Sequence, residues 1–343
     1  MSDPHPLVCR FGALGDMVLL TPMLRLLYHR SGLPCDVVGI GGINRMLFAE
    51  LPYVRNVYTI DSRSAPYWFN RSQRELVQHL RTQRYANVWI CETNRKSYRL
   101  LERAGITRDN SINQLDLPAK PGEHYCDKWL RLGNLGPAGF DFDPLPQEPP
   151  GTELRVSGAE VDACRQWLAQ LGIDPESPLI CLQAGSKRTT RRGRADRASN
   201  SKYWHERNWA ELIGRMQATL PNASVLLCGV PAESDMCDAI LAHCDNPQRV
   251  YNLANDLPLR RLLSLLSLAH SCISVDTGPA HIAAALDCPL VVLFGKASPA
   301  RFRPVSRHAA VQVIQGFADG DDEPDISHIS PTSVFEHWIE LQG

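Results

Sequence analysis

The chain has 343 residues, which is longer than a typical single domain and favours two domains. Its hydrophobic content of 44%, charged content of 21% and formal net charge of −1 are those of an ordinary globular protein and exclude a nucleic-acid binder that relies on overall positive charge. Eleven irregularly spaced cysteines without a C-x-x-C pair indicate neither a zinc site nor a disulfide framework and favour a reducing, cytoplasmic compartment. We expect no signal peptide and no membrane span.

The beginning of the chain predicts a strand, a glycine turn and a helix. The strand covers residues 6–10, the turn 11–16 and the helix 17–29. Gly12 and Gly15 let the backbone turn tightly and leave room for a ligand, but their G-x-x-G spacing is not a dinucleotide fingerprint. Asp16 is either a helix cap or a carboxylate at the mouth of a ligand cleft. This pattern is typical of the start of a nucleotide-type α/β fold.

Strands and helices then alternate through the first half of the chain. Strands are expected at 35–40, 57–60 and 87–91, and helices at 44–50 and 71–84, which together predict a parallel sheet covered on both faces. Several basic residues, among them Arg63, Arg95 and Lys96, follow predicted strand ends, where α/β folds place their ligands. They either belong to solvated helix faces or bind a phosphorylated or carboxylated acceptor.

A proline-rich segment, residues 140–151, predicts a linker between two domains. Beyond it the alternation resumes, with strands expected at 179–182, 224–228 and 250–253 and helices at 158–171, 205–220 and 233–243. We therefore predict an N-terminal domain of residues 1–145 and a C-terminal domain of residues 152–330. The terminal helix, residues 331–343, is expected to pack back on the first domain.

The segment Ser274–His281 lies between a predicted strand at 272–275 and a predicted helix at 281–286. A turn at Thr277, Gly278 and Pro279 would present backbone N–H groups at a helix N-terminus, which suits a phosphate. Asp276 and His281 flank this turn. The alternative is a buried strand–helix corner in which Asp276 acts only as a cap.

Three segments together resemble glycosyltransferase family 9, the ADP-heptose:lipopolysaccharide heptosyltransferases. Residues 275–286 are similar to the family's donor-binding signature, and residues 10–22 to its N-terminal G-D and T-P segment. Residues 202–212 resemble the K-x-W and A-E-L run that follows a G-[ST] turn, here Gly185-Ser186. The resemblance runs over nearly the whole chain. In this chain, residues 188–201 lengthen the connection between that turn and Lys202, which makes Lys187, Arg188 and Arg191 alternatives to Lys202.

The resemblance implies an α/β fold of GT-B architecture, with two Rossmann-like domains facing a central cleft and no metal or other cofactor. The C-terminal domain would bind the nucleotide-sugar, and the N-terminal domain the glycolipid or oligosaccharide acceptor. By position, Asp16 matches the general base, and Lys202 matches a group that stabilises the departing diphosphate. The implied donor-binding residues are Gly185, Ser186, Lys202, Glu233 at the ribose, Leu257 at the adenine, Asp276, Thr277, Gly278, Pro279 and His281. The expected acceptor-binding residues are Gly12, Gly15, Arg63, Arg95 and Lys96.

The resemblance predicts an inverting heptosyltransferase that acts on a lipopolysaccharide core or a related glycan. Two alternatives remain: a related transferase that uses another nucleotide-sugar, and a non-catalytic nucleotide-sugar-binding protein, which would have no need of Asp16. A nicotinamide oxidoreductase is disfavoured because the G-x-G-x-x-G pattern is missing. A lipid-linked acceptor would bring the protein to the cytoplasmic face of the inner membrane, with Arg25, His29 and Arg30 as candidate contacts.

Overall fold

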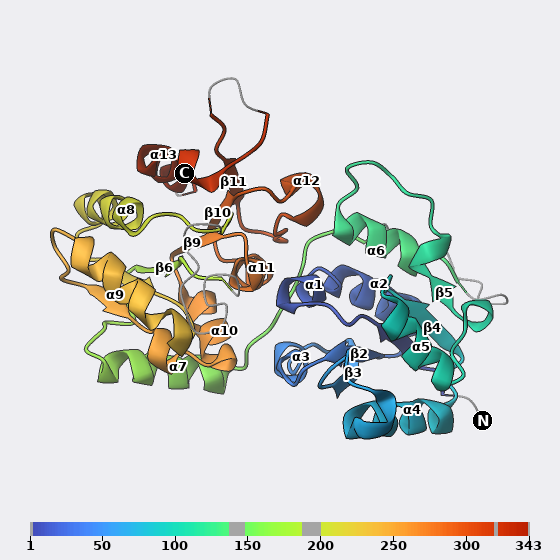
Figure 1. Ribbon diagram of the computed structural model, residues 1–343. Helices are drawn as coiled ribbons and strands as arrows, with labels where there is room; N and C mark the ends of the chain where they lie inside the picture. Colours follow the sequence, from blue (N-terminus) through green and yellow to red (C-terminus); the bar gives the residue numbers. More distant parts are fainter. Residues whose placement is uncertain (1–2, 137–147, 187–199, 319–321, 342–343) are drawn as a thin grey trace. The chain divides into compact units, whose positions relative to one another are not determined.

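The computed structural model describes residues 3–136, 148–186, 200–318 and 322–341 (Figure 1). The chain divides into two compact units, Met1–Arg155 and Val156–Gly343. The predicted linker lies partly outside the described residues, and its described end belongs to the first unit. There Arg25 donates to the carbonyl oxygens of Pro149 and Gly151, both at 3.1 Å, and pairs with the carboxylate of Glu148. The boundary therefore lies later than predicted, because this segment is bonded to the first unit.

The first unit contains a parallel five-stranded sheet in the order β3-β2-β1-β4-β5. Its strands are β1 (Pro6–Cys9), β2 (Cys35–Ile40), β3 (Val54–Ile60), β4 (Asn87–Ile90) and β5 (Ile112–Asn113). Its helices are α1 (Leu14–Val18), α2 (Thr21–Ser31), α3 (Ile43–Leu47), α4 (Arg71–Gln83), α5 (Arg95–Arg103) and α6 (Tyr125–Gly133), with short 3₁₀ turns η1 (Tyr67–Phe69), η2 (Arg108–Asn110) and η3 (Gln114–Asp116).

Helices cover both faces of this sheet, as its buried strands require (Figure 1). Apolar residues of α4 and α5 pack on one face, in a cluster with Leu7, Cys9 and Val38. Helices α2 and α6 pack against each other, and α2 also contacts β1 and β2. The single helix predicted at 17–29 is two helices, because Pro22 lies in the first turn of α2, where its missing N–H is tolerated.

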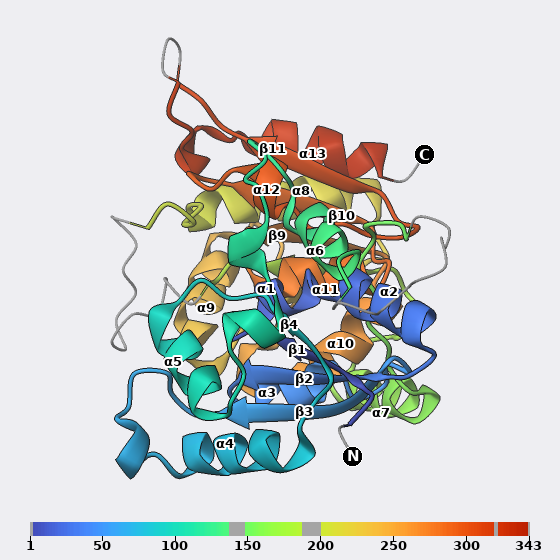
Figure 2. The same ribbon diagram turned by 90° about the vertical axis from the view of Figure 1, so that its right-hand side faces the viewer.

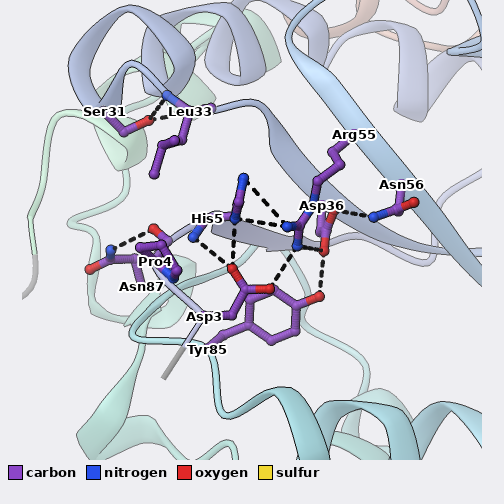
Figure 3. A network of polar contacts seen from close by, with 10 residues as sticks. All are labelled: Asp3, Pro4, His5, Ser31, Leu33, Asp36, Arg55, Asn56, Tyr85 and Asn87. Carbon is purple, nitrogen blue, oxygen red and sulfur yellow. Dashed lines mark hydrogen bonds and ion pairs between the residues drawn. The ribbon is translucent and has the colours of Figure 1, made fainter. Parts of the chain in front are cut away.

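A polar network ties the N-terminal segment to the amino end of this sheet (Figure 3). Asp36 in β2 is fully buried and accepts hydrogen bonds from Arg55 Nε at 2.9 Å, Arg55 Nη2 at 2.6 Å and Asn56 Nδ2 at 3.1 Å. The Tyr85 hydroxyl also donates to Asp36, and Arg55 continues to Asp3 at 2.7 Å. Burial and the Asp36 carboxylate raise the pKa of Tyr85 far above its usual range, so the phenol stays a donor.

The second unit contains a parallel six-stranded sheet in the order β11-β10-β9-β6-β7-β8. Its strands are β6 (Leu179–Gln183), β7 (Ser224–Leu227), β8 (Val250–Asn252), β9 (Ser271–Val275), β10 (Leu290–Phe294) and β11 (Val311–Gln315). Its helices are α7 (Gly158–Gln170), α8 (Glu206–Thr219), α9 (Ser234–His243), α10 (Leu259–Leu268), α11 (Gly278–Ala285), α12 (Pro299–Phe302) and α13 (Pro331–Glu340), with 3₁₀ turns η5 (Pro231–Glu233), η6 (Ala254–Asp256) and η7 (Ile326–His328).

The terminal helix α13 belongs to the second unit, which corrects the expectation that it packs on the first. Val334 and Trp338 are fully buried in a cluster with residues of α8 and the second sheet. The Trp338 indole also donates to the Ser271 hydroxyl at 2.8 Å. The helix has one apolar face, and α8 with the adjacent strands provides the surface that buries it.

The cysteines behave as small buried apolar side chains. All eleven are free thiols, and all except Cys244 are buried. Among the described residues, no helix has the length and apolar content needed to cross a membrane.

Candidate active site

Arg10 and Glu92 meet at the carboxyl end of the first sheet. Arg10 directly follows β1 and Glu92 closely follows β4, and these two strands are neighbours in the sheet. Arg10 Nη1 donates to the Cys91 carbonyl at 2.9 Å, and its Nη2 donates to Asp16 Oδ1 at 2.7 Å. The sheet order therefore places a guanidinium between a buried acid and the predicted general base.

The Asp16 carboxylate is held from both sides. Its Oδ2 accepts the backbone N–H of Ala13 at 2.9 Å, while Oδ1 accepts from Arg10. Asp16 is the third residue of α1 and bonds the N-cap residue Ala13 instead of being the cap itself, and its side chain remains 31% exposed. Gly12 allows this approach, because a Cβ there would lie 2.4 Å from Asp16 Cβ. Gly15 lies within α1, where its carbonyl accepts from Leu19.

Glu92 is 2% exposed and is surrounded by donors. Its Oε1 accepts the Phe11 N–H at 2.6 Å and lies 4.0 Å from Arg10 Nη1, and its Oε2 lies 3.9 Å from Arg63 Nη1. Burial alone would lower the pKa of Arg10, but the Asp16 and Glu92 carboxylates outweigh it and raise that pKa. The structure thus joins Arg63, one predicted acceptor residue, to the Asp16 cluster.

Arg95 and Lys96 lie in the first turn of α5 and are exposed. Within the described parts of the chain, no side-chain hydrogen bond or ion pair joins them to the Asp16 cluster. Sequence reasoning missed Arg10 and Glu92 as site residues. Both follow the carboxyl ends of strands, and that signal could have found them once the pairing of β1 with β4 was known.

In the second unit, Lys202 is bonded to Asp276. Lys202 Nζ donates to Asp276 Oδ2 at 2.7 Å and to the Asp276 carbonyl at 2.6 Å. Asp276 directly follows β9, and its N–H donates to the Leu293 carbonyl of β10 at 2.9 Å. This contact brings the ammonium to the carboxyl end of the second sheet, and one of its three N–H bonds is not used by these two contacts.

The start of α11 lies beside this pair. Thr277 is the N-cap residue, and its side chain makes no capping hydrogen bond. Gly278 and Pro279 form the first helical positions, and His281 is buried one turn later with 6% exposure. A helix N-terminus with backbone donors and its positive dipole end next to an ammonium is suited to an anionic group.

Glu233 lies under the turn that follows β6. A Cβ at Gly185 would lie 2.4 Å from Glu233 Cδ, so a larger residue there would force the Glu233 carboxylate to move. Glu233 Oε2 accepts the Val230 N–H at 3.1 Å, and the Gln183 amide reaches the Gly185 carbonyl at 3.0 Å. Ser186 in the same turn is buried. Leu257, 8% exposed, ends η6, which contacts η5.

The predicted site residues therefore form two groups, one in each unit. Lys187, Arg188 and Arg191, which the sequence offers as alternatives to Lys202, lie outside the described residues. In the described ranges, no group of three or more His, Cys, Asp or Glu residues could hold a metal ion.

Comparison with known proteins connects both units to one family. The family model described as glycosyltransferase family 9 (heptosyltransferase) matches residues 192–319. Lipopolysaccharide heptosyltransferase 2 of Salmonella typhimurium is 26% identical over 321 residues, which cover 89% of this chain and 86% of that protein. Both matches make the chain similar to glycosyltransferase family 9. These similarities support a glycosyltransferase related to the heptosyltransferases.

Other comparisons agree with this similarity. Lipopolysaccharide heptosyltransferase 1 of Pseudomonas aeruginosa is 30% identical over 208 residues, 57% of this chain and 48% of that protein. The fold matches the solved structure of Escherichia coli ADP-heptose lipopolysaccharide heptosyltransferase II with a TM-score of 0.74 and 23% identity, over 98% of each chain. A family 9 structure from Veillonella parvula gives a TM-score of 0.77 at 17% identity, over 99% of this chain and 97% of that one. The predicted α/β fold of the GT-B type, with a Rossmann-like sheet in each unit, is confirmed.

Proposed function

We propose that this chain is a family 9 enzyme that transfers heptose from ADP-heptose to a lipopolysaccharide core or a related cell-surface glycan, with inversion. The observation that carries the proposal is the Asp16 carboxylate, which Arg10 and the Ala13 N–H hold at the carboxyl end of the first sheet. The names of the similar proteins, lipopolysaccharide heptosyltransferase 2 and ADP-heptose lipopolysaccharide heptosyltransferase II, support the choice of donor and acceptor.

In this proposal Asp16 is the general base. It takes the proton from an acceptor hydroxyl while that oxygen attacks the anomeric carbon and the bond to the nucleotide diphosphate breaks. Each carboxylate oxygen of Asp16 accepts one hydrogen bond, and a carboxylate oxygen can accept two, so each keeps a lone pair for the proton. A general base contributes about 10²–10⁴ in rate.

Lys202 and the N-terminus of α11 would stabilise the departing diphosphate. A carboxylate beside a diphosphate is unfavourable by itself, so we assign Asp276 the task of holding Lys202 through the 2.7 Å contact while its other oxygen faces the sugar. Gly185, Ser186, Thr277, Gly278 and Pro279 would supply backbone or hydroxyl contacts to the phosphates, and His281 would lie against the sugar-diphosphate. Glu233 and Leu257, on adjoining turns, would contact the ribose and the adenine. The reaction needs no resident metal or cofactor.

The acceptor would bind to the first unit, beside Gly12, Gly15, Arg63, Arg95 and Lys96. Arg95 and Lys96 occupy the first turn of α5, where the helix dipole disfavours cations by about 0.3–1 kcal/mol each. An anionic group on the acceptor would offset this cost. We further propose that the enzyme works in the cytoplasm, peripherally bound to the cytoplasmic face of the inner membrane where a lipid-linked acceptor would lie.

A calorimetric titration of the full chain with ADP, UDP, GDP and CMP tests the donor. We expect ADP to bind best. Lys202→Ala should weaken ADP binding by roughly tenfold or more, because it removes a charge-assisted contact to phosphate. Arg215→Ala is the control, since Arg215 is an exposed cation of the same unit that pairs with Glu211 along α8, away from the carboxyl end of the sheet.

Tighter binding of UDP, GDP or CMP than of ADP would exclude ADP-heptose as the donor. The protein would then be a transferase that uses a different nucleotide-sugar. Unchanged affinity in Lys202→Ala would remove Lys202 from the phosphate site. ADP binding without transfer to any core oligosaccharide would favour the alternative of a non-catalytic nucleotide-sugar-binding protein.

A further inference from the structure

Two aromatic side chains project from the first unit after β3. In η1, Trp68 is 68% exposed and Phe69 is 89% exposed, more than any other large apolar side chain in the described ranges. Burying a large apolar side chain is favourable. Adjacent exposed aromatic side chains therefore indicate a surface that binds a membrane or another protein.

The fold holds η1 in place. The Phe69 N–H donates to the Pro66 carbonyl at 3.1 Å, and Arg74 Nη1 donates to the Trp68 carbonyl at 2.8 Å. The Arg103 guanidinium lies over the Tyr67 ring at 4.5 Å and 5.8 Å from the Trp68 ring centroid. A hydrogen bond from α4 and cation–π contacts from α5 thus hold the aromatic turn, and Phe69 remains exposed.

Basic side chains lie on the two helices that contact this aromatic turn, α4 and α5. Figure 2 shows α5 and the chain leading into α4 at the same edge of the first unit. The aromatic–basic patch consists of Trp68, Phe69, Arg71, Arg74, Arg99 and Arg103, all of them exposed. The only acids on the same stretches of α4 and α5 are Glu75, which pairs with Arg71 at 2.6 Å, and Glu102.

We propose that the aromatic–basic patch docks on a lipid bilayer that carries anionic headgroups. Tryptophan and other aromatic rings favour the membrane–water interface, and arginines beside them are attracted to anionic lipids. Neither signal suffices alone: a few apolar atoms bind weakly, and a small basic cluster binds only in low salt. The aromatic–basic patch combines exposed aromatic side chains with arginines on one surface.

Of the membrane contacts expected from the sequence, Arg25, His29 and Arg30, the structure argues against Arg25. Arg25 is 4% exposed and is bonded to Glu148 and Glu153, so its charge is neutralised inside the unit. The patch instead includes α5, whose first turn holds the proposed acceptor residues Arg95 and Lys96. Docking there would place a lipid-linked acceptor next to the helix that we expect to bind it. The inference rests on the part of the proposed function that makes the acceptor lipid-linked.

Sedimentation of the full chain with lipid vesicles tests the proposal. The vesicles contain either phosphatidylcholine alone or a mixture with phosphatidylglycerol, and no glycan acceptor. We expect binding only to the anionic vesicles and weaker binding as salt rises from about 50 to about 500 mM. The double variant Trp68→Ser/Phe69→Ser should lower the partition coefficient about tenfold, and Arg71→Gln/Arg99→Gln by a similar factor.

Phe317→Ser is the matched control, because Phe317 is an aromatic residue of the second unit with 51% exposure. It should leave vesicle binding unchanged, and circular dichroism should show all variants folded. The proposal is overturned if the wild type does not bind anionic vesicles at low salt. It is also overturned if the patch variants bind these vesicles as well as Phe317→Ser does. Patch variants that bind vesicles normally but lose a protein partner would show that the surface binds protein instead.

A transfer assay with a delipidated, water-soluble core oligosaccharide separates this inference from the proposed function. Transfer without vesicle binding would refute docking and leave the function intact. Vesicle binding that depends on the patch, without transfer, would support docking and count against the function.

Discussion

Asp36 and Asp16 lie at opposite ends of the same sheet and differ in what surrounds them. Asp36, at the amino end, is fully buried and accepts four hydrogen bonds, from Arg55, Asn56 and Tyr85 (Figure 3). Asp16, at the carboxyl end, accepts two and keeps a side chain that is 31% exposed. All four hydrogen-bond positions of the Asp36 carboxylate are therefore occupied by protein donors, whereas the Asp16 carboxylate can accept further hydrogen bonds.

This difference separates a stabilising role from a chemical one. A buried carboxylate with every lone pair occupied contributes to the fold but has nothing left for a substrate. A partly exposed carboxylate held by an arginine and one backbone N–H keeps its orientation and can still accept a proton. We therefore expect Asp36 variants to lose stability and Asp16 variants to lose turnover.

Asp16→Asn should have the largest effect. An amide keeps the shape of the side chain but is not a base, so we expect turnover to fall about 10³-fold. The unfolding midpoint should change little, because the lost ion pair with Arg10 is partly exposed. Steady-state kinetics with ADP-heptose and a core acceptor, alongside a thermal melt, measure both. Near-normal turnover would remove Asp16 from the role of general base.

Asp36→Asn should have the reverse profile. Replacing the buried carboxylate leaves Asp3 as the remaining acidic partner of the partly exposed Arg55, and we expect a loss of about 2 kcal/mol in the free energy of unfolding. Urea unfolding followed by tryptophan fluorescence should show an earlier transition, while turnover per folded molecule at low temperature stays normal. If Asp36→Asn lost as much turnover as Asp16→Asn, the assignment of a stabilising role to Asp36 and a chemical role to Asp16 would be wrong.

Glu92→Gln tests whether the Asp16 end also depends on a buried acid. We expect turnover to fall about tenfold, because the loss of the negative charge loosens Arg10, and Arg10 orients Asp16. ADP affinity should not change, since the proposed donor site belongs to the second unit. A loss of ADP binding, or unchanged turnover, would contradict this positioning role.

The sequence predicted local structure well where periodicity and motifs carry the information. The bounds of β2 agree with the expected 35–40, and α4 and α7 differ from expectation by one residue. The alternation of strands and helices is enough to predict two parallel sheets, because it leaves few other ways to bury so many apolar strands. The motif around Asp276 likewise lies between a strand and a helix, as expected.

Contacts that depend on strand order were not predictable in the same way. Arg10 and Glu92 are 82 positions apart and meet only because β1 pairs with β4. The Asp36 network has the same origin, since Tyr85 and Arg55 reach it from distant segments. The terminal helix was assigned to the wrong unit because an apolar face specifies that a helix is buried but not against which surface.

Glu160, in the second unit, gives the smallest expected effect and extends the comparison to pH. It accepts from Arg260 Nε at 2.6 Å and from the Ser157 N–H at 3.0 Å, which joins the start of α7 to α10. Mainly through the Arg260 hydrogen bond, against a smaller opposing effect of burial, its pKa falls from 4.5 to about 2.

Because the folded state lowers this pKa, the stabilisation is complete above about pH 4.5 and is lost as the pH falls toward 2. After allowance for solvent screening of a side chain that is 30% exposed, we expect about 1–2 kcal/mol. Glu160→Gln should remove this part of the acid sensitivity in unfolding curves measured between pH 5 and pH 2. Glu211→Gln, at an exposed pair with Arg215, is the control and should change the curve by only a few tenths of a kcal/mol. If Glu160→Gln and Glu211→Gln lost equal amounts of unfolding free energy, the hydrogen bonds of Glu160 to Arg260 and to the Ser157 N–H would stabilise the fold no more than a surface ion pair does. The contrast between Asp36 and Asp16 would then have to rest on burial alone.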